Sequence, residues 1–235
     1  MIRKIFLLSW ICLLHLGCGP VDMPDSKLVP NHVVEVKEAK TADVFVRMFS
    51  GHLFIGPNAK TLMVGTYQYN NPTNAPTMNY TEIDQKGWLS LLQADIPTIG
   101  TFPRNDAMNR WDIQLNKDFP TELSIEFGKG DGKINLNDMN LTFFRLLNKK
   151  GKLDIDLSTS KLKEDLVLWM DNEAGEISIH LPKNVGVQVT TVRGAQIVAE
   201  GFKKEDAVYK NEWAGSDAKQ IFVDIKSEAG TINVR

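Results

Sequence analysis

Hydrophobic and polar residues alternate with a period of two along most of the chain after residue 33. In the second half, every other residue is apolar in eight short runs, which are 123–127, 134–136, 153–157, 166–170, 177–181, 185–189, 221–225 and 232–234. The first half contains the similar runs "DVFVRMF", "TLMVGTYQY", "MNYTEID" and "GWLSLLQ", and residues 84–87 between the last two fit a hairpin turn. Strict alternation is typical of β-strands with one buried and one solvated face.

Glycines recur between the runs of the second half. They stand about 20 residues apart, with one longer interval that contains a polar insertion at 201–219. These predicted structural turn glycines are Gly132, Gly151, Gly175, Gly194 and Gly230. We expect them in tight turns with positive φ, and we expect Gly51 to begin an earlier, more degenerate copy. Such a spacing is typical of stacked coils, each of which buries its apolar face against its neighbours.

The pattern therefore predicts an all-β protein, a repetitive stacked-strand solenoid with a hairpin-rich N-terminal part. Residues 18–32 contain three prolines and are expected to form an extended tether. Residues 33–110 are expected to form an N-terminal β region. Residues 111–235 are expected to form the repetitive β-solenoid region and to continue directly from it.

The N-terminus has the pattern of an export signal. Arg3 and Lys4 precede an apolar run at 5–16, which is shorter than the roughly 20 residues that a membrane-spanning helix needs. The run ends in "LHLGC", which resembles a bacterial lipoprotein signal. We therefore expect a signal peptide at 1–17 and lipid attachment at Cys18. The alternative is an ordinary signal peptide with a cysteine by chance. Gly19, by resemblance to sorted lipoproteins, favours the outer membrane or cell surface in a cell with two membranes.

Composition excludes several classes of protein. The chain has 235 residues, of which 24% are charged and 43% hydrophobic, with acids and bases interspersed and a net charge of −2. These values are ordinary for a folded protein and do not predict a nucleic-acid partner. The two cysteines, Cys12 and Cys18, both lie at the N-terminus, so no disulfide is expected in the mature domain.

The stretch "FGKGDGKINLND" at 127–138 is the best candidate for metal chemistry. Asp131 would take position 5 of an EF-hand calcium loop, but Phe127 and Lys129 would then occupy two ligand positions. Asp131 therefore remains only a weak calcium candidate. The glycines here alternate and precede a strand pattern, which differs from a nucleotide-binding loop. We predict no metal, no cofactor and no catalytic residue.

Histidines and tryptophans give no clear site. His32, His52 and His180 have no ligand-like spacing, and we interpret them as surface or turn residues. Most of the tryptophans beyond the signal are expected in the core; they are Trp88, Trp111, Trp169 and Trp213. Trp169 and Phe222 fall on the solvated face of their strands, where they would pack against neighbours or form a binding patch.

The segment "WDIQLNKDFPTELSIEFGKGDGKINL" resembles the start of the bacterial toast-rack domain family, which is related to the C-terminal domain of cell-wall-active antibiotic response proteins. The shared features are Trp111-Asp112, Pro120, the alternation at Leu123 and Ile125, and the Gly-x-Gly turn. "LPKNVGVQV" and "AGTINV" fit the same pattern, so the resemblance covers about 34–235. The turns "NKKGK" and "NEAGE" lack a second glycine, so the turns cannot share one ligand role. The resemblance implies an envelope-facing β-solenoid, in some members linked to envelope stress sensing or adhesion, without established catalysis.

From the sequence we therefore expect an exported lipoprotein that is anchored to a bacterial membrane. Its β-solenoid would be a non-catalytic scaffold for envelope proteins, with a link to cell-envelope stress. The alternative is a surface adhesin or glycan-binding protein. A hydrolase with an unrecognised site is a more distant alternative.

Overall fold

The structure is a computed structural model that describes residues 26–94, 108–192, 196–216 and 219–235. These residues form 17 strands and one short 3-10 helix, η1 (Pro72–Asn74). The predicted signal peptide, Cys18 and Gly194 lie outside the described residues. Within the described part, no helix is long and apolar enough to cross a membrane.

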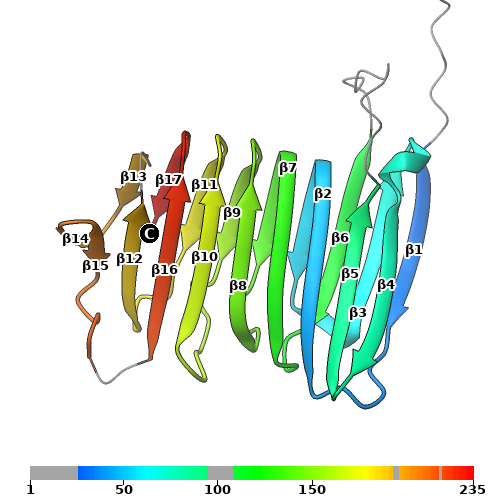
Figure 1. Cartoon of the computed structure of the whole chain (residues 1–235), viewed down its shortest axis with the longest axis horizontal. Coiled ribbons are helices and arrows are strands. Elements are labelled where there is room, and N and C mark those ends of the chain that lie inside the picture. Colours follow the sequence, from blue (N-terminus) through cyan, green and yellow to red (C-terminus); the bar gives the residue numbers. More distant parts are fainter. Residues whose placement is uncertain (1–25, 95–107, 193–195, 217–218) are drawn as a thin grey trace, which may run out of the picture.

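The strands form two layers that face each other (Figure 1). The front layer contains, in spatial order, β4 (Pro76–Ile83), β5 (Lys86–Gln93), the first halves of β2 (Thr41–Gly56) and β7 (Thr121–Asn135), β8 (Leu141–Asn148), β10 (Leu166–Asn172), β16 (Gln220–Ser227), β12 (Gly186–Val192), β15 (Val208–Lys210) and β14 (Lys203–Glu205). The back layer contains β1 (Lys27–Val34), β3 (Asn58–Tyr69), β6 (Asn109–Asn116), the second halves of β2 and β7, β9 (Lys152–Asp156), β11 (Glu176–His180), β17 (Thr231–Val234) and β13 (Gln196–Ala199).

The core lies between the two layers. All the alternating apolar residues predicted for the second half are buried, from Leu123 in β7 to Val234 in β17. In the N-terminal part, Trp111 is completely buried, packs edge-on against Tyr67 and donates from Nε1 to the carbonyl of Asn74 at 3.2 Å. The predicted all-β stacked fold is thus confirmed, because each coil covers the apolar face of the next.

Two long strands pass from one layer to the other without turning back. β2 and β7 are parallel and paired along nearly their whole length, with Gly51 beside Gly130. Both glycines have positive φ, +133° and +118°. A Cβ on Gly130 would stand 2.0 Å from the carbonyl oxygen of Gly51, so this bend requires glycine. The expected earlier copy at Gly51 is confirmed. The turn expected at Gly132 is wrong, because Gly132 lies inside the continuous strand β7.

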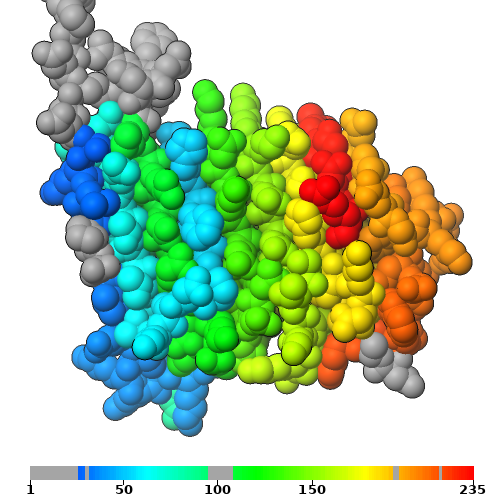
Figure 2. All heavy atoms as spheres, turned by 180° about the vertical axis from the view of Figure 1, so that it is seen from behind, coloured from blue at the N-terminus to red at the C-terminus, as the bar shows by residue number. Residues whose placement is uncertain are grey.

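The coils do not stack in sequence order. The coil made of β16 and β17 lies between the coil β10–β11 and the coil β12–β13. Figure 2, seen from behind, shows the red C-terminal segment between the yellow and orange segments. The hairpin of β14 and β15 continues the front layer beyond β12. Its outermost strand, Lys203–Glu205, is fully exposed and charged, a composition that protects a sheet edge from further pairing.

A column of polar side chains runs through the turns between the two layers. Asn148 and Asn172 are completely buried one coil apart, and Asn148 Nδ2 donates to Asn172 Oδ1 at 2.9 Å. Each Asn Oδ1 also accepts from the N–H of the glycine three residues later, and its Nδ2 donates to the carbonyl of that glycine. Ser227 continues the column in β16. We call Asn148, Asn172 and Ser227 the asparagine column. Its sequence signal is the recurring Asn-x-x-Gly and Ser-x-x-Gly spacing.

The turn glycines are required mainly by close contact between coils. A Cβ on Gly151 would stand 2.3 Å from the ring of Phe127, and one on Gly175 would stand 2.4 Å from the carbonyl oxygen of Gly151. Four of the five predicted turn glycines lie in the described residues: Gly132, Gly151, Gly175 and Gly230. Of these four, only Gly230 has a positive φ, +93°. The expectation of positive φ is therefore wrong for Gly132, Gly151 and Gly175. At Gly151 and Gly175, glycine is needed because the preceding coil leaves no room for a side chain.

The predicted boundaries of the N-terminal part need correction. Residues 27–32, expected in the tether, belong to β1, which pairs with β3 at the edge of the back layer. The register shifts between Val29 and His32, around Pro30, and an edge strand tolerates such an irregularity. The boundary expected between 110 and 111 falls inside β6. The expected hairpin is confirmed, with Asp84 and Gln85 at positive φ between β4 and β5.

The loop after β1 is held by one carboxylate. Glu82 accepts hydrogen bonds from the backbone N–H groups of Lys37, Glu38 and Ala39 at 2.8–3.0 Å and from the hydroxyl of Tyr80 at 2.8 Å. These donors, led by the N–H of Lys37 and then that of Glu38, lower the pKa of Glu82 to about 2. Burial, together with the hydrogen bond to Glu82, raises the pKa of Tyr80.

We predict that Glu82 contributes to acid sensitivity. Because its folded-state pKa is below its ordinary value of 4.5, its stabilisation is complete above about pH 4.5 and is lost as the pH falls toward 2. Glu82→Gln should lower the unfolding temperature at pH 7, and its difference from wild type should shrink over this range. Thermal unfolding at several pH values measures this. Glu38→Gln, an exposed side chain in the same loop, is the control. Parallel curves for wild type and Glu82→Gln would contradict the prediction.

Candidate functional site

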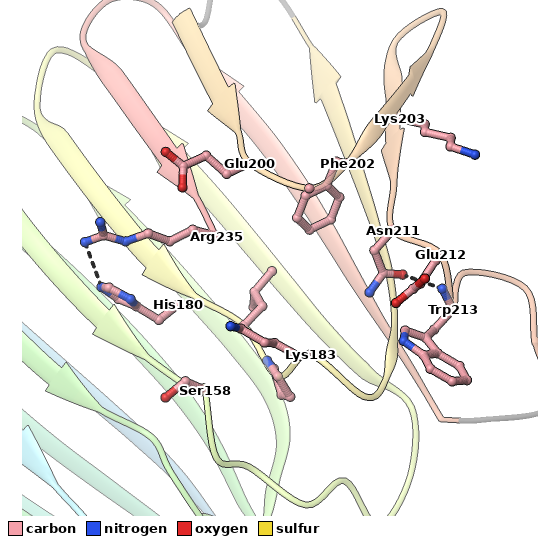
Figure 3. Close-up of a pocket in the computed structure, with 13 residues that line it drawn as sticks. Ser158, His180, Lys183, Glu200, Phe202, Lys203, Asn211, Glu212, Trp213 and Arg235 are labelled. Atoms are coloured by element: carbon pink, nitrogen blue, oxygen red, sulfur yellow. Dashed lines mark hydrogen bonds between the residues drawn. The ribbon is translucent and has the colours of Figure 1, made fainter.

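A large cavity lies at one end of the stack, where the strands of the back layer end (Figure 3). It has a volume of about 830 Å³, within the range of ligand pockets. We call it the end cleft. Leu181 and Pro182, which follow β11 and are buried, belong to its lining. The rest of the lining comes from the segments before β14 and after β15, and from residues after β9 and β17. Parallel strands bring these distant segments together because their carboxyl ends meet at one edge.

One side of the end cleft is basic. His180, at the end of β11, contacts Asp154 of β9 through Nε2 at 2.9 Å, and Nη2 of Arg235 lies 3.4 Å from the same nitrogen. Nε2 cannot donate to Asp154 and also accept from Arg235. The shorter, charge-assisted contact favours donation to Asp154, so the guanidinium of Arg235 lies beside His180 without a strong bond. Lys183 is exposed and lies in the middle of the cleft (Figure 3).

The other side of the end cleft is aromatic. Trp213 is 44% exposed, and Phe202 is half-buried. The loop that carries Trp213 is fixed by Asn211, whose Oδ1 accepts from the N–H of Val187 at 2.9 Å and of Trp213 at 3.2 Å. Nδ2 of Asn211 donates to the carbonyl of Val185 at 2.8 Å. This loop is therefore anchored to the start of β12, and Trp213 is presented from a fixed backbone.

The hydroxyl in the end cleft is not paired with the histidine. The backbone N–H of Ser158 donates to Asp156 Oδ1 at 2.9 Å, and its side chain also bonds to Asp156. Partial burial of Asp156 opposes its ionisation, but the bonds from Ser158 and Asn137 and the nearby His180 outweigh it and lower the pKa of this carboxyl. Ser158 therefore bonds to a carboxylate of lowered pKa, which is a weaker base than the histidine that activates the serine of a catalytic triad.

The predicted weak metal candidate, Asp131, lies outside the end cleft and has a histidine and a lysine as neighbours. Asp131 is on β7, beside His52 of β2 and Lys152 of β9. Its Oδ2 is 3.7 Å from Nδ1 of His52, and both side chains are about two-thirds exposed. Among the described residues, no group of three acids, histidines or cysteines gathers in a way that could hold a metal ion. Within the described residues, Asp131 therefore has no neighbouring carboxylates with which it could coordinate a calcium ion.

The tryptophan expectations have mixed outcomes. Trp111 is in the core as expected, but Trp88 and Trp213 are 45% and 44% exposed. Trp169 lies on the outer face and packs beneath Arg145, whose Cζ is 4.7 Å from its ring centroid. The neighbour packing expected for Trp169 is thus confirmed. Trp213, which lines the end cleft, was predicted for the core and not as a site residue. The sequence signal for Trp213 was its position as an aromatic residue in the polar insertion at 201–219, where apolar and polar residues do not alternate.

The outer face of the front layer carries a short apolar row. Phe143, Val167 and Phe222 are neighbours on the adjacent strands β8, β10 and β16. We call these three residues the outer stripe. Val167 is 37% exposed, and both phenylalanines are half-buried. Arg145 is exposed on the same face and, among the described residues, has no carboxylate partner within ion-pair distance.

One family model and one similar solved structure agree with the fold. A family model described as the N-terminal domain of toast-rack matches residues 24–186. The crystal structure of a putative cell adhesion protein from Clostridium sporogenes is similar, with a TM-score of 0.82 and 29% identity over 90% of this chain and 98% of that chain. For a putative adhesin from Bacteroides fragilis, the TM-score is 0.33 with 13% identity, over 89% and 97% of the two chains. No curated protein matches the chain.

Proposed function

Since the chain belongs to the toast-rack N-terminal domain family, we propose that it is a lipid-anchored scaffold of the bacterial cell envelope that binds envelope proteins without catalysis. The similarity to a structure described as a putative cell adhesion protein supports a location at the cell surface or envelope. The N-terminal pattern that ends at Cys18 supports export and lipid anchoring. Burial of acyl chains, at about 0.8 kcal/mol per methylene, would supply the anchor.

The outer stripe is the observation that carries the protein-binding role. Exposed apolar residues that are contiguous across strands are uncommon on an isolated soluble domain and favour an interface. The stripe lies on a parallel sheet, which is a rigid platform. Arg145 beside it would meet a carboxylate of the partner. The partner chemistry that fits is therefore a flat, largely apolar protein surface with an acidic residue at its rim.

Site-specific crosslinking in living cells tests this role. A photo-crosslinking amino acid at Val167 should capture a distinct envelope protein, and the amount captured should change when the cell wall is stressed. The same amino acid at Lys133, exposed on the back half of β7, is the matched control. Identical products at both positions, or none at Val167, would overturn the role of the outer stripe.

The anchor has its own test. Cys18→Ser should move the protein from the membrane fraction to the soluble extracytoplasmic fraction, because no acyl chain can be attached to the serine. The folded domain should be unaffected, so thermal unfolding of the purified variant is the control. If the variant stays in the membrane fraction in full, the lipoprotein assignment fails.

A surface adhesin that binds glycans is the second candidate function. The end cleft favours it, because an exposed tryptophan and several polar groups converge in one concave surface. The two candidate functions use different surfaces, so one can hold without the other.

A further inference from the structure

The end cleft contains charged side chains that lack ion-pair partners. Among the described residues, Lys183, Arg235, Glu200 and Glu212 line the cleft, and none of them has an opposite charge within ion-pair distance. Unpaired cations and carboxylates in one concave surface are free to bind a ligand that carries both an anionic group and hydrogen-bond donors.

Trp213 and Phe202 supply the apolar part of the cleft. An indole that is 44% exposed inside a concave surface offers a flat face to a ring-shaped ligand. The C–H face of a sugar ring is apolar and flat, whereas its hydroxyls project around the rim. The anchoring of this loop by Asn211 keeps the ring of Trp213 on a fixed backbone, which reduces the entropy cost of binding.

The positions of the charged side chains limit the class of ligand that fits the end cleft. Figure 3 shows Lys183 between the aromatic side and the pair of His180 and Arg235, so the cations follow the cleft. Arginine and lysine both bind carboxylates, and the guanidinium of arginine can do so through two parallel hydrogen bonds. Glu200 and Glu212 would accept hydrogen bonds from hydroxyls. The same two carboxylates would repel a doubly charged phosphate, so a ligand with one negative charge per ring fits better.

We propose that the end cleft binds an acidic oligosaccharide whose rings each carry one carboxylate. One ring packs on Trp213, the carboxylates lie at Lys183 and Arg235, and hydroxyls bond to Glu212 and Glu200. The proposal rests on the second candidate function, glycan binding, and names the class of glycan. It does not depend on the protein-binding role of the outer stripe, because the two surfaces share no residue.

Titration with defined sugars tests the proposal. The probes are trigalacturonate, its neutral counterpart galactotriose, and inorganic phosphate, each followed by calorimetry and by tryptophan fluorescence on the full chain. Trigalacturonate should bind at least about tenfold more tightly than galactotriose, a difference of about 1.4 kcal/mol. Its binding should weaken as salt is raised, because the carboxylate contacts are partly exposed. Phosphate should not compete at equal concentration.

Two variants and a matched control locate the site. Trp213→Ala and Arg235→Gln should each weaken trigalacturonate binding about tenfold or more. Trp88→Ala removes a tryptophan of nearly equal exposure, 45% against 44%, far along the stack on β5, and should leave binding unchanged. Thermal unfolding shows whether each variant is folded, and a variant that is not folded is replaced by Trp213→Phe or Lys183→Gln.

Several results would overturn the proposal. They are equal affinity for the acidic and neutral sugars, full competition by phosphate, no binding at about 10 mM sugar, and unchanged binding in a folded Trp213 variant. Crosslinking from Val167 in the folded Trp213→Ala variant separates the two roles. This variant should lose sugar binding and still capture the envelope protein, because the outer stripe and the end cleft share no residue.

Discussion

Deletion of residues 219–235 is expected to unfold β12 to β15, the strands that come just before them in the sequence. The deletion removes five fully buried apolar side chains, which are Ile221, Val223, Ile225, Ile232 and Val234. At about 1.5–3 kcal/mol each, their burial contributes on the order of 10 kcal/mol, which is comparable to the whole stability of a typical domain. The coil β12–β13 would also lose the neighbour that separates it from β10–β11.

Hydrogen exchange resolved along the sequence measures this effect. Amides of 186–210 should lose protection in the deletion variant, whereas amides of β2 and β7, which pair with each other, should remain protected. Addition of a synthetic peptide of residues 219–235 should restore protection, because it supplies the missing strands. Continued protection of 186–210 without the peptide would show that β12 can pair directly with β10, contrary to the prediction.

Asn172→Ala should destabilise the protein by about 4 kcal/mol. Its Oδ1 accepts from the N–H of Gly175 at 3.1 Å and from Asn148 Nδ2 at 2.9 Å. Its Nδ2 donates to the carbonyl of Gly175 at 3.0 Å and lies within 3.4 Å of two further acceptors on the next coil. Alanine would leave these buried groups without partners and would open a cavity at a completely buried position.

Urea unfolding at neutral pH measures the loss in free energy of unfolding. In thermal unfolding, the melting temperature should fall by about 10 °C. Asn233→Ala is the matched control, because Asn233 lies on the outer face of β17 and is only half-buried. That change should stay within about 0.5 kcal/mol of wild type. An Asn172→Ala variant as stable as the control would show that water replaces the missing side chain in the asparagine column.

The strand faces are predictable from the sequence because burial repeats every second residue. Leu166, Leu168 and Met170 are buried, while Val167 and Trp169 between them face outward. The same local rule predicts the hairpin at 84–87. The asparagine column is harder to predict from the sequence. Each buried Asn stands three residues before a glycine, and this spacing is informative only because it recurs.

The order of the coils is not contained in the local pattern. Val185, Val187 and Val189 present the same kind of inner face as Ile221, Val223 and Ile225, so either run could pair with β10. Pairing of Leu166 with Ile221 joins residues far apart in the chain, and it depends on packing of the whole stack. The end cleft is unpredictable for the same reason, because Lys183, Trp213 and Arg235 are brought together only after the strands are stacked.

The position of β16 and β17 between the earlier coils also affects the order in which the chain can fold during synthesis. During synthesis the chain emerges from its N-terminus, so β12 to β15 are available before the strands that must lie beside them exist. The last three coils can therefore reach their final arrangement only after residue 234 has emerged. Pairings over such long sequence separations form slowly. β16 and β17 thus complete the stack. Until they have paired, the incomplete stack is the state most exposed to chaperones and proteases.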